Sequence, residues 1–392
     1  MGGSIEKRGK NSWRLVCSSG YDQNGKRKKR TKTVKCKNKS KARIELAKFI
    51  TEIEAGEYIA PEKMVFGRFV EEWMNKYALK DLAPTTIAAF NTHLQNRILP
   101  YFSHMRLDQI KTIHIINYLA SLEKAGRKDG TGKPLSSSTI EYNHRVLRNI
   151  FQRAVDWQLI KSSPVASVKK PKVTQKEVQV YNEADVIRLF KCLQGERAMW
   201  RMLISLAVTG GLRRGELLGL EWKHIDFEKS TIQIKQTVSH ANGEYVVREP
   251  KTANSRRTIS IPGALIEELK SYKKNTNRER IQAGELWEGG EHYFLFSSWN
   301  GKPLYPSSVT TWWRSFTKRN KLSHIKFHAL RHTSATLLIN KGVHAKTISS
   351  RLGHADIRTT MNIYGHALQE ADQVAANHYD SLFEGKQKTD TK

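Results

Sequence analysis

The spacing of hydrophobic residues divides the chain into a short strand-rich start, a helical middle and a mixed C-terminal half. Alternating residues over 13–18 and 30–34 predict two strands, joined by a turn at 21–25 that contains Asn-Gly. A helix is expected next, with Ser40 as its N-cap. Its apolar stripe is Ile44, Ala47, Phe49, Ile50 and Ile53. The first sixty residues therefore predict a small sheet backed by one helix.

From residue 64 to residue 163 the apolar positions recur at helical spacing, which predicts an all-helical unit of about four helices. Pro84 opens the second helix, a polar loop covers 126–134, and Ser138 is expected to cap the fourth helix. The apolar stripes are Phe66, Phe69, Val70, Trp73, Met74 and Tyr77 in the first helix, Ile113, Ile116, Leu119 and Leu122 in the third, and Ile140, Leu147, Ile150, Phe151, Ala154 and Val155 in the fourth.

Beyond a basic linker at 166–174 the pattern is mixed, with helices predominating up to about residue 384. The pattern predicts helices over 183–193 and 198–208, strands over 231–235, 245–248 and 257–261, and an Asn242-Gly243 turn between the first two strands. We therefore expect three domains and a flexible tail. Their ranges are 1–58, 64–165 and 175–384, followed by 385–392.

Charge changes this picture more than composition does. The 392 residues include 67 Lys and Arg against 37 Asp and Glu, a net charge of +30, which predicts a polyanionic partner. Nucleic acid is the first choice and an anionic membrane surface the second, because the basic residues are spread along the chain instead of gathering on one amphipathic helix. Residues 1–60 hold 16 basic and 6 acidic residues, which indicates a separate nucleic-acid-binding module.

Several classes of protein are disfavoured by the same sequence. No apolar run is long enough to span a bilayer, and the first residues lack the apolar core of a signal peptide. Cys17, Cys36 and Cys192 have no zinc-type spacing, so we expect reduced packing thiols in a cytoplasmic protein. We also expect no metal and no cofactor, since no carboxylate pair and no phosphate-binding Gly-x-x-x-x-Gly-Lys loop is found.

Three short segments carry candidate functional residues. Thr209–Leu220 places Arg213 where a glycine turn leads into a helix, a position that favours anions. His328 and Arg331 are three residues apart and share a helix face. Leu352-Gly353-His354 is followed ten residues later by Tyr364. Each segment alone is typical of an ordinary exposed turn or helix.

Together and in this order, the segments resemble the tyrosine recombinase family, the phage-type integrases, over roughly residues 64–384. The family pattern falls on Arg213, Lys251, His328, Arg331, His354 and Tyr364, with Glu216 as its structural acidic residue. Lys251 stands in Pro-Lys-Thr before a strand, as in the family hairpin. Gly210-Gly211 is a departure, because many members have one glycine there; we expect a slightly lengthened or loosened turn.

The resemblance implies a role for each of these residues. Tyr364 would attack a DNA phosphodiester, although its unperturbed pKa near 10 leaves it almost un-ionised at neutral pH. Arg213 and Arg331 would grip the non-bridging oxygens, and His328 would accept the tyrosine proton or bind the phosphate. Lys251 would protonate the leaving 5′ oxygen. His354 would bind a phosphate oxygen, and the covalent 3′-phosphotyrosine would make ATP unnecessary.

The resemblance also implies a multidomain fold. Its parts are a small α+β N-terminal DNA-binding domain, an all-α core-binding, SAM-like domain, and a mixed, mainly α catalytic domain with a small β-sheet. The first sixty residues resemble, more loosely, the arm-binding domain of the larger integrases, a three-stranded sheet plus helix. This predicts an integrase of a phage or integrative mobile element, working in the bacterial host on its nucleoid as a homotetramer through a Holliday junction. A C-terminal helix within 367–392 is expected to dock on a neighbouring protomer.

The expected partners are double-stranded DNA at core and arm attachment sites, and further copies of the chain. An excisionase or a DNA-bending host factor is an additional partner that the resemblance allows; no membrane partner is expected. Three alternatives stay open: a type IB-like topoisomerase, a chromosome-dimer resolvase, and a non-enzymatic DNA-binding regulator. Tyr379 is a second tyrosine near the C-terminus, and Trp312 and Trp313 are expected to be packing aromatics.

Overall fold

The computed structural model describes residues 3–21, 27–54, 64–127, 131–173, 178–241, 243–250, 255–358 and 360–361. The chain divides into two compact units, Met1–Gln175 and Lys176–Lys392. Within the described ranges, no helix combines the length and apolar character needed to cross a membrane.

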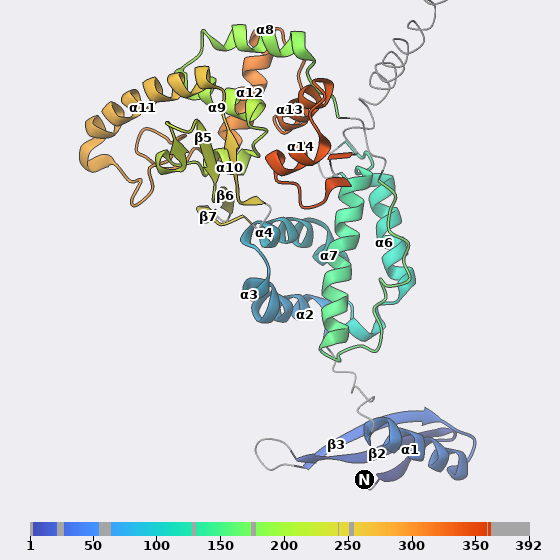
Figure 1. Ribbon diagram of the computed structural model, residues 1–392. Helices are drawn as coiled ribbons and strands as arrows, with labels where there is room; N and C mark the ends of the chain where they lie inside the picture. The colour runs from blue at the N-terminus through green and yellow to red at the C-terminus, as the bar shows by residue number, and fades with distance from the viewer. Residues whose placement is uncertain are drawn as a thin grey trace, which may run out of the picture. The chain divides into compact units, whose positions relative to one another are not determined.

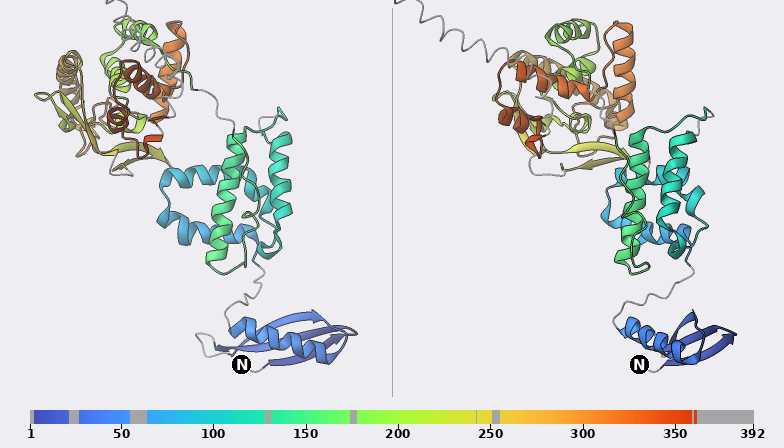
Figure 2. Two further views of the ribbon diagram at one scale, coloured as in Figure 1. Left: turned by 45° about the vertical axis from the view of Figure 1, so that its right-hand side comes forward. Right: turned by 90° about the vertical axis from the view of Figure 1, so that its right-hand side faces the viewer.

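The N-terminal residues form an antiparallel sheet of order β1-β2-β3 with one helix across a face (Figures 1 and 2). These elements are β1 (Gly3–Gly9), β2 (Ser12–Tyr21), β3 (Arg27–Lys35) and α1 (Lys39–Glu54). Leu15, Cys17 and Phe49 are fully buried between the sheet and the helix. The predicted strands and helix are thus confirmed, and the third strand agrees with the arm-domain resemblance.

Helix α1 begins one residue earlier than Ser40, so the prediction of Ser40 as its N-cap is wrong. The Asn38 side-chain oxygen instead accepts a hydrogen bond from the Lys41 backbone N–H at 3.0 Å, which is the capping geometry. The predicted stripe is also partly wrong, because Ile44 and Ala47 are exposed. The inward face consists of Ala42, Leu46, Phe49 and Ile50, which follow the i, i+4, i+7, i+8 spacing.

The second part of this unit is helical, with a core built around the predicted first-helix stripe. Its elements are α2 (Phe66–Trp73), the π-helix η1 (Met74–Ala78), α3 (Leu79–Asp81), α4 (Pro84–His93), the π-helix η2 (Leu94–Ile98), α5 (Leu99–Phe102), the 3₁₀-helix η3 (Leu107–Gln109), α6 (Thr112–Ala125) and α7 (Ser137–Asp156). Helices α6 and α7 lie side by side (Figure 1). A buried hydrogen bond from the Tyr118 hydroxyl to the Asn143 side-chain oxygen, 2.9 Å long, joins them.

Two predictions in the helical part need correction. Ile113 and Ile116 are 54% and 45% exposed, because a spacing of three residues drifts by about 60° per step around a helix of 3.6 residues per turn. The buried face of α6 is Ile115, Tyr118, Leu119 and Leu122. The N-cap of α7 is Ser136, whose hydroxyl accepts from the Thr139 backbone N–H, and Ser138 lies inside the first turn.

The second unit is mainly helical, with two small sheets. Its helices are α8 (Glu183–Leu193), α9 (Ala198–Thr209), α10 (Arg214–Leu218), the 3₁₀-helix η4 (Trp222–His224), α11 (Gly263–Ala283), the 3₁₀-helix η6 (Gly284–Leu286), α12 (Pro306–Arg319), α13 (Ala329–Asn340) and α14 (Ala345–Leu352). Its strands are β4 (Ile225–Asp226), β5 (Thr231–Ile234), β6 (Thr237–Ala241), β7 (Glu244–Arg248) and β8 (Arg257–Ser260).

Strand β6 was not expected, and it changes the pairing of the strands. The predicted turn near residue 242 joins β6 to β7, whereas β5 lies between β4 and β8 in a separate sheet. Ile232 pairs with Ile259 at the centre of that sheet, and both are buried against α9 and its neighbours. Residue 242 itself lies outside the described residues.

The core of this unit confirms the packing role of two aromatic residues. Trp313 is buried and donates a 2.7 Å hydrogen bond to the Ile325 carbonyl. Trp312 stacks on Trp200 with ring centroids 4.5 Å apart. The three cysteines, all within the described ranges, are free thiols.

Candidate active site

Arg213 stands directly before α10, in a turn that depends on glycine. Gly211 has φ +61°, and a Cβ on it would lie 2.3 Å from a side-chain carbon of Leu352. Its carbonyl accepts a 2.7 Å hydrogen bond from the guanidinium of Arg331. The second glycine therefore does not loosen the turn as we expected; it allows the turn to pack closely against α14.

Arg331 and His328 come from the start of α13. Arg331 is buried, with 3% of its surface exposed, and His328 is the residue directly before the helix. One Arg331 guanidinium nitrogen reaches the Gly211 carbonyl, and the other donates to the Leu352 carbonyl at 2.6 Å. Arg331 thus ties the Arg213 turn to the end of α14.

The C-terminal end of α14 is the centre of the arrangement. Three consecutive carbonyls there each accept a hydrogen bond from one arginine. The Arg351 carbonyl accepts from Arg257 at 2.6 Å, the Leu352 carbonyl accepts from Arg331 at 2.6 Å, and the Gly353 carbonyl accepts from Arg213 at 3.2 Å. The last carbonyls of a helix have no partner within the helix and carry partial negative charge, so cations are favoured there.

Glu216 is the acidic partner of the cluster. It is 1% exposed and accepts from the Arg213 backbone N–H at 2.9 Å and from the Arg213 guanidinium at 2.7 Å. Arg257 donates to both carboxylate oxygens, at 3.3 and 2.9 Å. Burial alone would raise the pKa of Glu216, but the hydrogen bonds and charges of Arg257 and Arg213 outweigh it and lower that pKa below its usual value.

Arg257 is a residue that the sequence reasoning missed. Its side chain is 6% exposed, and it connects β8 with Glu216 and with the Arg351 carbonyl. In the sequence it is the first residue of the predicted strand 257–261, which does not distinguish it from the neighbouring basic residues. Its contacts come from segments 41 and 94 residues away, so no local pattern could have identified them.

His354 follows the α14 cap directly. Gly353 has the left-handed φ of +66° that ends the helix, and the chain then brings the His354 Nδ1 to 2.8 Å from the buried Thr360 hydroxyl. Loss of hydration, followed by the charges of Arg331 and Arg213, lowers the pKa of His354 to about 4. The imidazole is therefore neutral at pH 7.

His328 behaves in the same way. It keeps an exposed edge, yet loss of hydration on its buried side, together with His332, Arg331 and Arg213, lowers its pKa to about 4. The ring of His332 meets it edge-on with centroids 5.3 Å apart. Burial and the charge of Arg213 also lower the pKa of Arg331 to about 9, which leaves this guanidinium protonated at neutral pH.

Four of the six predicted site residues are therefore brought together: Arg213, His328, Arg331 and His354. Lys251 and Tyr364 lie outside the described residues, as do Tyr379 and the segment 367–392. Lys251 belongs to the connection between β7 and β8, and β8 carries Arg257. Within the part of the chain that the structure describes, no three His, Cys, Asp or Glu side chains cluster as metal ligands would.

Comparison with known proteins agrees with this geometry. The profile of the phage integrase family matches residues 179–371, and the profile of the N-terminal SAM-like domain of phage integrases matches residues 65–122. A XerC-like tyrosine recombinase of Caldanaerobacter subterraneus is 29% identical over 96% of this chain and 98% of its own length. The chain belongs to the tyrosine recombinase family.

Other relatives of this recombinase come from mobile elements. The ICEBs1 integrase of Bacillus subtilis is 26% identical over 74% of this chain and 76% of its own length. Among solved structures, the Tn1549 transposon integrase in complex with circular intermediate DNA has a TM-score of 0.65 and 21% identity, covering 79% of this chain and 99% of that one. A lambda integrase tetramer bound to a Holliday junction has a TM-score of 0.56 and 16% identity, covering 92% and 94%. These likenesses confirm the multidomain, mainly helical fold.

Proposed function

We propose that this site-specific recombinase is the integrase of a phage or another integrative element and cuts DNA by attack of Tyr364 on a phosphodiester. The observation that carries the proposal is the charge of the arginine cluster. Arg213 and Arg257 pair with one buried carboxylate, Glu216, whereas Arg331 is held by backbone carbonyls. Three guanidiniums and one carboxylate leave the described part of the cluster with an excess of two positive charges. A phosphodiester carries the charge that this excess attracts, and its non-bridging oxygens suit planar guanidinium donors.

The two arginines nearest to the histidines retain donors for a substrate. A guanidinium has five N–H groups. The contacts made within the described residues use two terminal nitrogens of Arg331 and two of Arg213, and the carbonyl contacts hold both planes in place. Such fixed donors stabilise the negative charge that develops in the transition state without reorganising.

Neutral histidines fit the remaining roles. A neutral His328 can accept the proton of the tyrosine hydroxyl, which an imidazolium cannot do. If Thr360 donates to the Nδ1 of His354, the Nε2 of that ring carries the proton and can donate to a phosphate oxygen. Lys251 would protonate the leaving 5′ oxygen. The phosphotyrosine would conserve the bond energy for rejoining, so that neither ATP nor a metal ion is needed.

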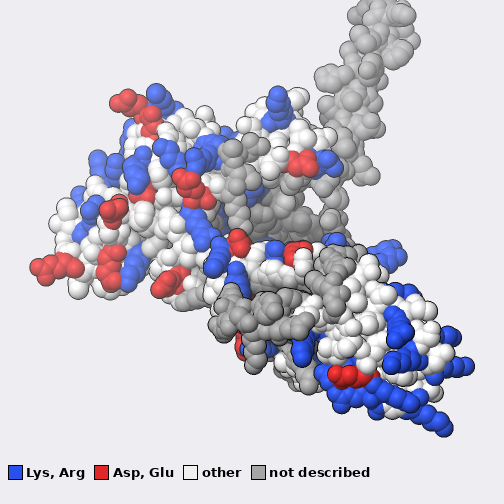
Figure 3. Space-filling model, turned by 90° about the horizontal axis from the view of Figure 1, so that it is seen from below, with Lys and Arg blue, Asp and Glu red and all other residues white. Residues whose placement is uncertain are grey.

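The proposed DNA contact extends beyond the active site. Lysine and arginine predominate over acidic residues on the face drawn in Figure 3, in line with the net charge of +30. We propose three modules that act on DNA: residues 1–58 on arm sites, 64–165 and 175–384 on the core site. A homotetramer passing through a Holliday junction would then exchange the strands, with an excisionase or DNA-bending factor setting the direction.

The test is covalent capture on a nicked suicide substrate carrying the core site, which can be found by sequencing the DNA that flanks the gene. The wild-type chain should leave a protein–DNA adduct on a denaturing gel, and Tyr364→Phe should bind the same DNA without forming it. Tyr379→Phe is the matched control and should form the adduct normally. An adduct that survives Tyr364→Phe would assign the nucleophile elsewhere.

A two-site assay separates recombination from a topoisomerase activity with the same chemistry. A recombinase exchanges flanking markers between two DNA sites, whereas a topoisomerase relaxes supercoils and leaves the markers in place. Formation of the adduct without marker exchange, under conditions that supply both sites, would favour the topoisomerase. Absence of any adduct would favour a regulator that only binds DNA.

A further inference from the structure

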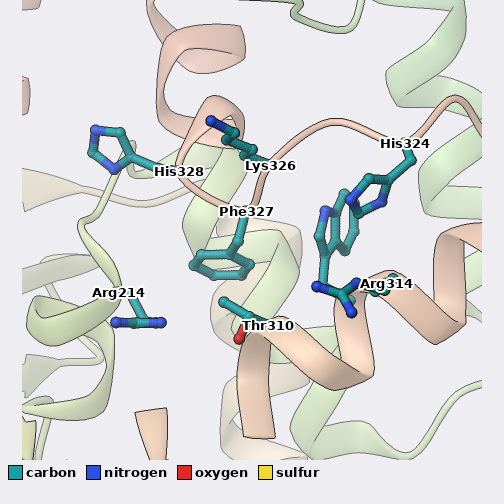
Figure 4. A pocket seen from close by; sticks show the side chains of 8 residues that line it. Arg214, Thr310, Arg314, His324, Lys326, Phe327 and His328 are labelled. Atoms are coloured by element: carbon teal, nitrogen blue, oxygen red, sulfur yellow. The ribbon is translucent and has the colours of Figure 1, made fainter. Parts of the chain in front are cut away.

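Beside the active site lies a pocket of about 420 Å³, and His328 is the one residue of the recombinase motif among those that line it (Figure 4). It is formed by α12, the start of α10 and the segment that leads into α13. Its lining residues are Arg214, Thr310, Trp313, Arg314, His324, Lys326, Phe327 and His328. None of these eight residues is acidic, and three of them carry a permanent positive charge.

The floor and one wall of the pocket are rigid. Trp313 and Phe327 are buried, and the indole N–H of Trp313 is held by the Ile325 carbonyl. The Nδ1 of His324 lies 3.0 Å from the Thr317 hydroxyl, which fixes that ring at the rim. The pocket is therefore a built feature of the fold.

Among the described residues, no carboxylate pairs with the cations of the pocket. Arg214 donates to the Pro306 carbonyl, which is neutral, at 3.2 Å. Within the described ranges, the head groups of Arg314 and Lys326 contact no hydrogen-bond acceptor and no carboxylate. Three like charges around one hollow repel each other, and an anion placed between them would relieve that repulsion.

The position of the pocket identifies the anion. Arg213 and Arg214 are consecutive, yet the first turns toward Glu216 and Gly353 and the second toward Pro306 and the pocket. His328 connects the pocket with the arginine cluster, because it lines the pocket and its pKa is lowered by burial and by the charges of Arg331 and Arg213. A DNA strand carries one phosphate per 3.4 Å of helix axis, so a strand bound at the arginine cluster brings a further phosphate close by.

We propose that this pocket binds the backbone phosphate next to the scissile one on the cleaved strand, through Arg214, Arg314 and Lys326. The inference rests on the proposed function, since it takes the arginine cluster as the scissile-phosphate site. Holding two successive phosphates fixes the direction of the strand across His328. Alignment of the scissile phosphorus with the attacking oxygen then does not depend on the arginine cluster alone.

The experiment uses the full chain and core-site duplexes in which single phosphates are replaced by uncharged methylphosphonates. The test protein is the double variant Arg314→Gln, Lys326→Gln, whose two side chains are exposed, so the change should leave thermal unfolding unaltered. Lys274→Gln, an exposed lysine on α11 that does not line the pocket, is the matched control. The pair Arg314→Lys, Lys326→Arg keeps the charges and should restore binding.

For the wild-type chain, the uncharged linkage beside the scissile phosphate should weaken binding and slow formation of the adduct. For the double variant, that same linkage should cause no further loss, whereas uncharged linkages elsewhere keep their effects. The slope of log affinity against log salt should also fall by about 0.9, as expected for one lost phosphate contact. The control should keep the wild-type profile at every position.

The proposal is overturned if the adjacent uncharged linkage lowers the affinity of the double variant for DNA as much as that of the wild type. It is overturned as well if Lys274→Gln changes the dependence of binding on the position of the uncharged linkage in the same way as the double variant. It is also overturned if the charge-keeping pair fails to restore binding. Failure of the proposed function has a different signature. In that case the wild-type chain forms no Tyr364 adduct on any duplex, while the binding profile can still report the second phosphate.

Discussion

Removing the charge of Glu216 provides a sharp test of how the arginine cluster is held. Glu216→Gln keeps the size of the side chain but leaves Arg257, which is 6% exposed, and part of Arg213 without their counter-charge. The glutamine also directs an N–H₂ group at guanidinium donors, which replaces at least one attraction by a repulsion. We therefore expect a large effect from a substitution that changes almost no volume.

The magnitude follows from burial. Removing one partner of a buried ion pair costs about 3–5 kcal/mol, because the remaining charge stays buried and uncompensated. Exposed pairs are worth about 0–1 kcal/mol. The matched control is Glu267→Gln, since Glu267 pairs with Lys270 at 2.7 Å and both side chains are well exposed. The two variants make the same chemical change, so the difference between them reports the buried network.

The assay must report the second unit, because the chain has two units and unfolding of the whole need not be two-state. Hydrogen exchange of the amides in α9, α13 and α14, measured in the full chain, supplies that local probe. Glu216→Gln should reduce their protection strongly, and Glu267→Gln should leave it nearly unchanged. Because the folded pKa of Glu216 is lowered, the stabilisation is present above its unfolded pKa and should disappear as the pH falls through the folded pKa.

A double-mutant cycle completes this test. Arg257→Met alone leaves Glu216 with one guanidinium, and Arg257→Met combined with Glu216→Gln removes both charges of the most buried pair. The combined variant should be more stable than the sum of the single losses predicts. Equal protection in Glu216→Gln and Glu267→Gln, or strict additivity in the cycle, would refute the view that this buried pair organises the site.

Four further outcomes are expected. Formation of the adduct in excess EDTA should match the untreated reaction, and a collapse that magnesium restores would contradict the proposed chemistry. Deleting residues 1–58 should leave core-site cleavage intact but weaken binding to arm-bearing DNA and make its salt dependence shallower. In NMR titration of the free protein, the imidazoles of His328 and His354 should stay neutral down to near their pKa of about 4. Because imidazoles of the unfolded chain titrate near 6.5, the free energy of unfolding should increase as the pH rises from about 4 to 6.5. Gly353→Ala should lower the free energy of unfolding by about 1–2 kcal/mol, since the φ of Gly353, +66°, is left-handed. It should also slow cleavage, because it displaces the adjacent His354; thermal unfolding followed by circular dichroism and the rate of adduct formation measure the two effects.

Much of the fold followed from hydrophobic spacing alone. The stripe beginning at Phe66, the helix over 183–193 and the strands β2, β3 and β5 were predicted near their observed bounds. The errors in helix capping lie where two neighbouring residues can both take the N-cap position. Asn38 and Ser40 can both cap a helix, and so can Ser136 and Ser138; the choice depends on which residue lies in extended backbone, which tertiary packing decides.

The site residues were predicted as a set from the family resemblance, and the structure brings four of them together. What the sequence could not supply is the framework that holds them. Arg257 joins β8 to α10 and to the end of α14, and the pocket beside His328 is assembled from three separate segments. Such contacts join residues far apart in the chain, so neither spacing nor periodicity encodes them locally.

The way in which the arginines are held explains how the cluster can be rigid and still bind a phosphate. A guanidinium fixed by carboxylates would be neutralised by them, and its attraction for DNA would be lost. Here the fixing is done mainly by the carbonyls of Gly211, Leu352 and Gly353, which are dipoles without net charge. A single carboxylate, Glu216, pairs with Arg257 and Arg213, and the buried Arg331 is held by carbonyls alone. The helix end thus sets the geometry of the cations while leaving most of their charge for the substrate, and the glycine turns at residues 211 and 353 are what allow the backbone to approach closely enough to do so.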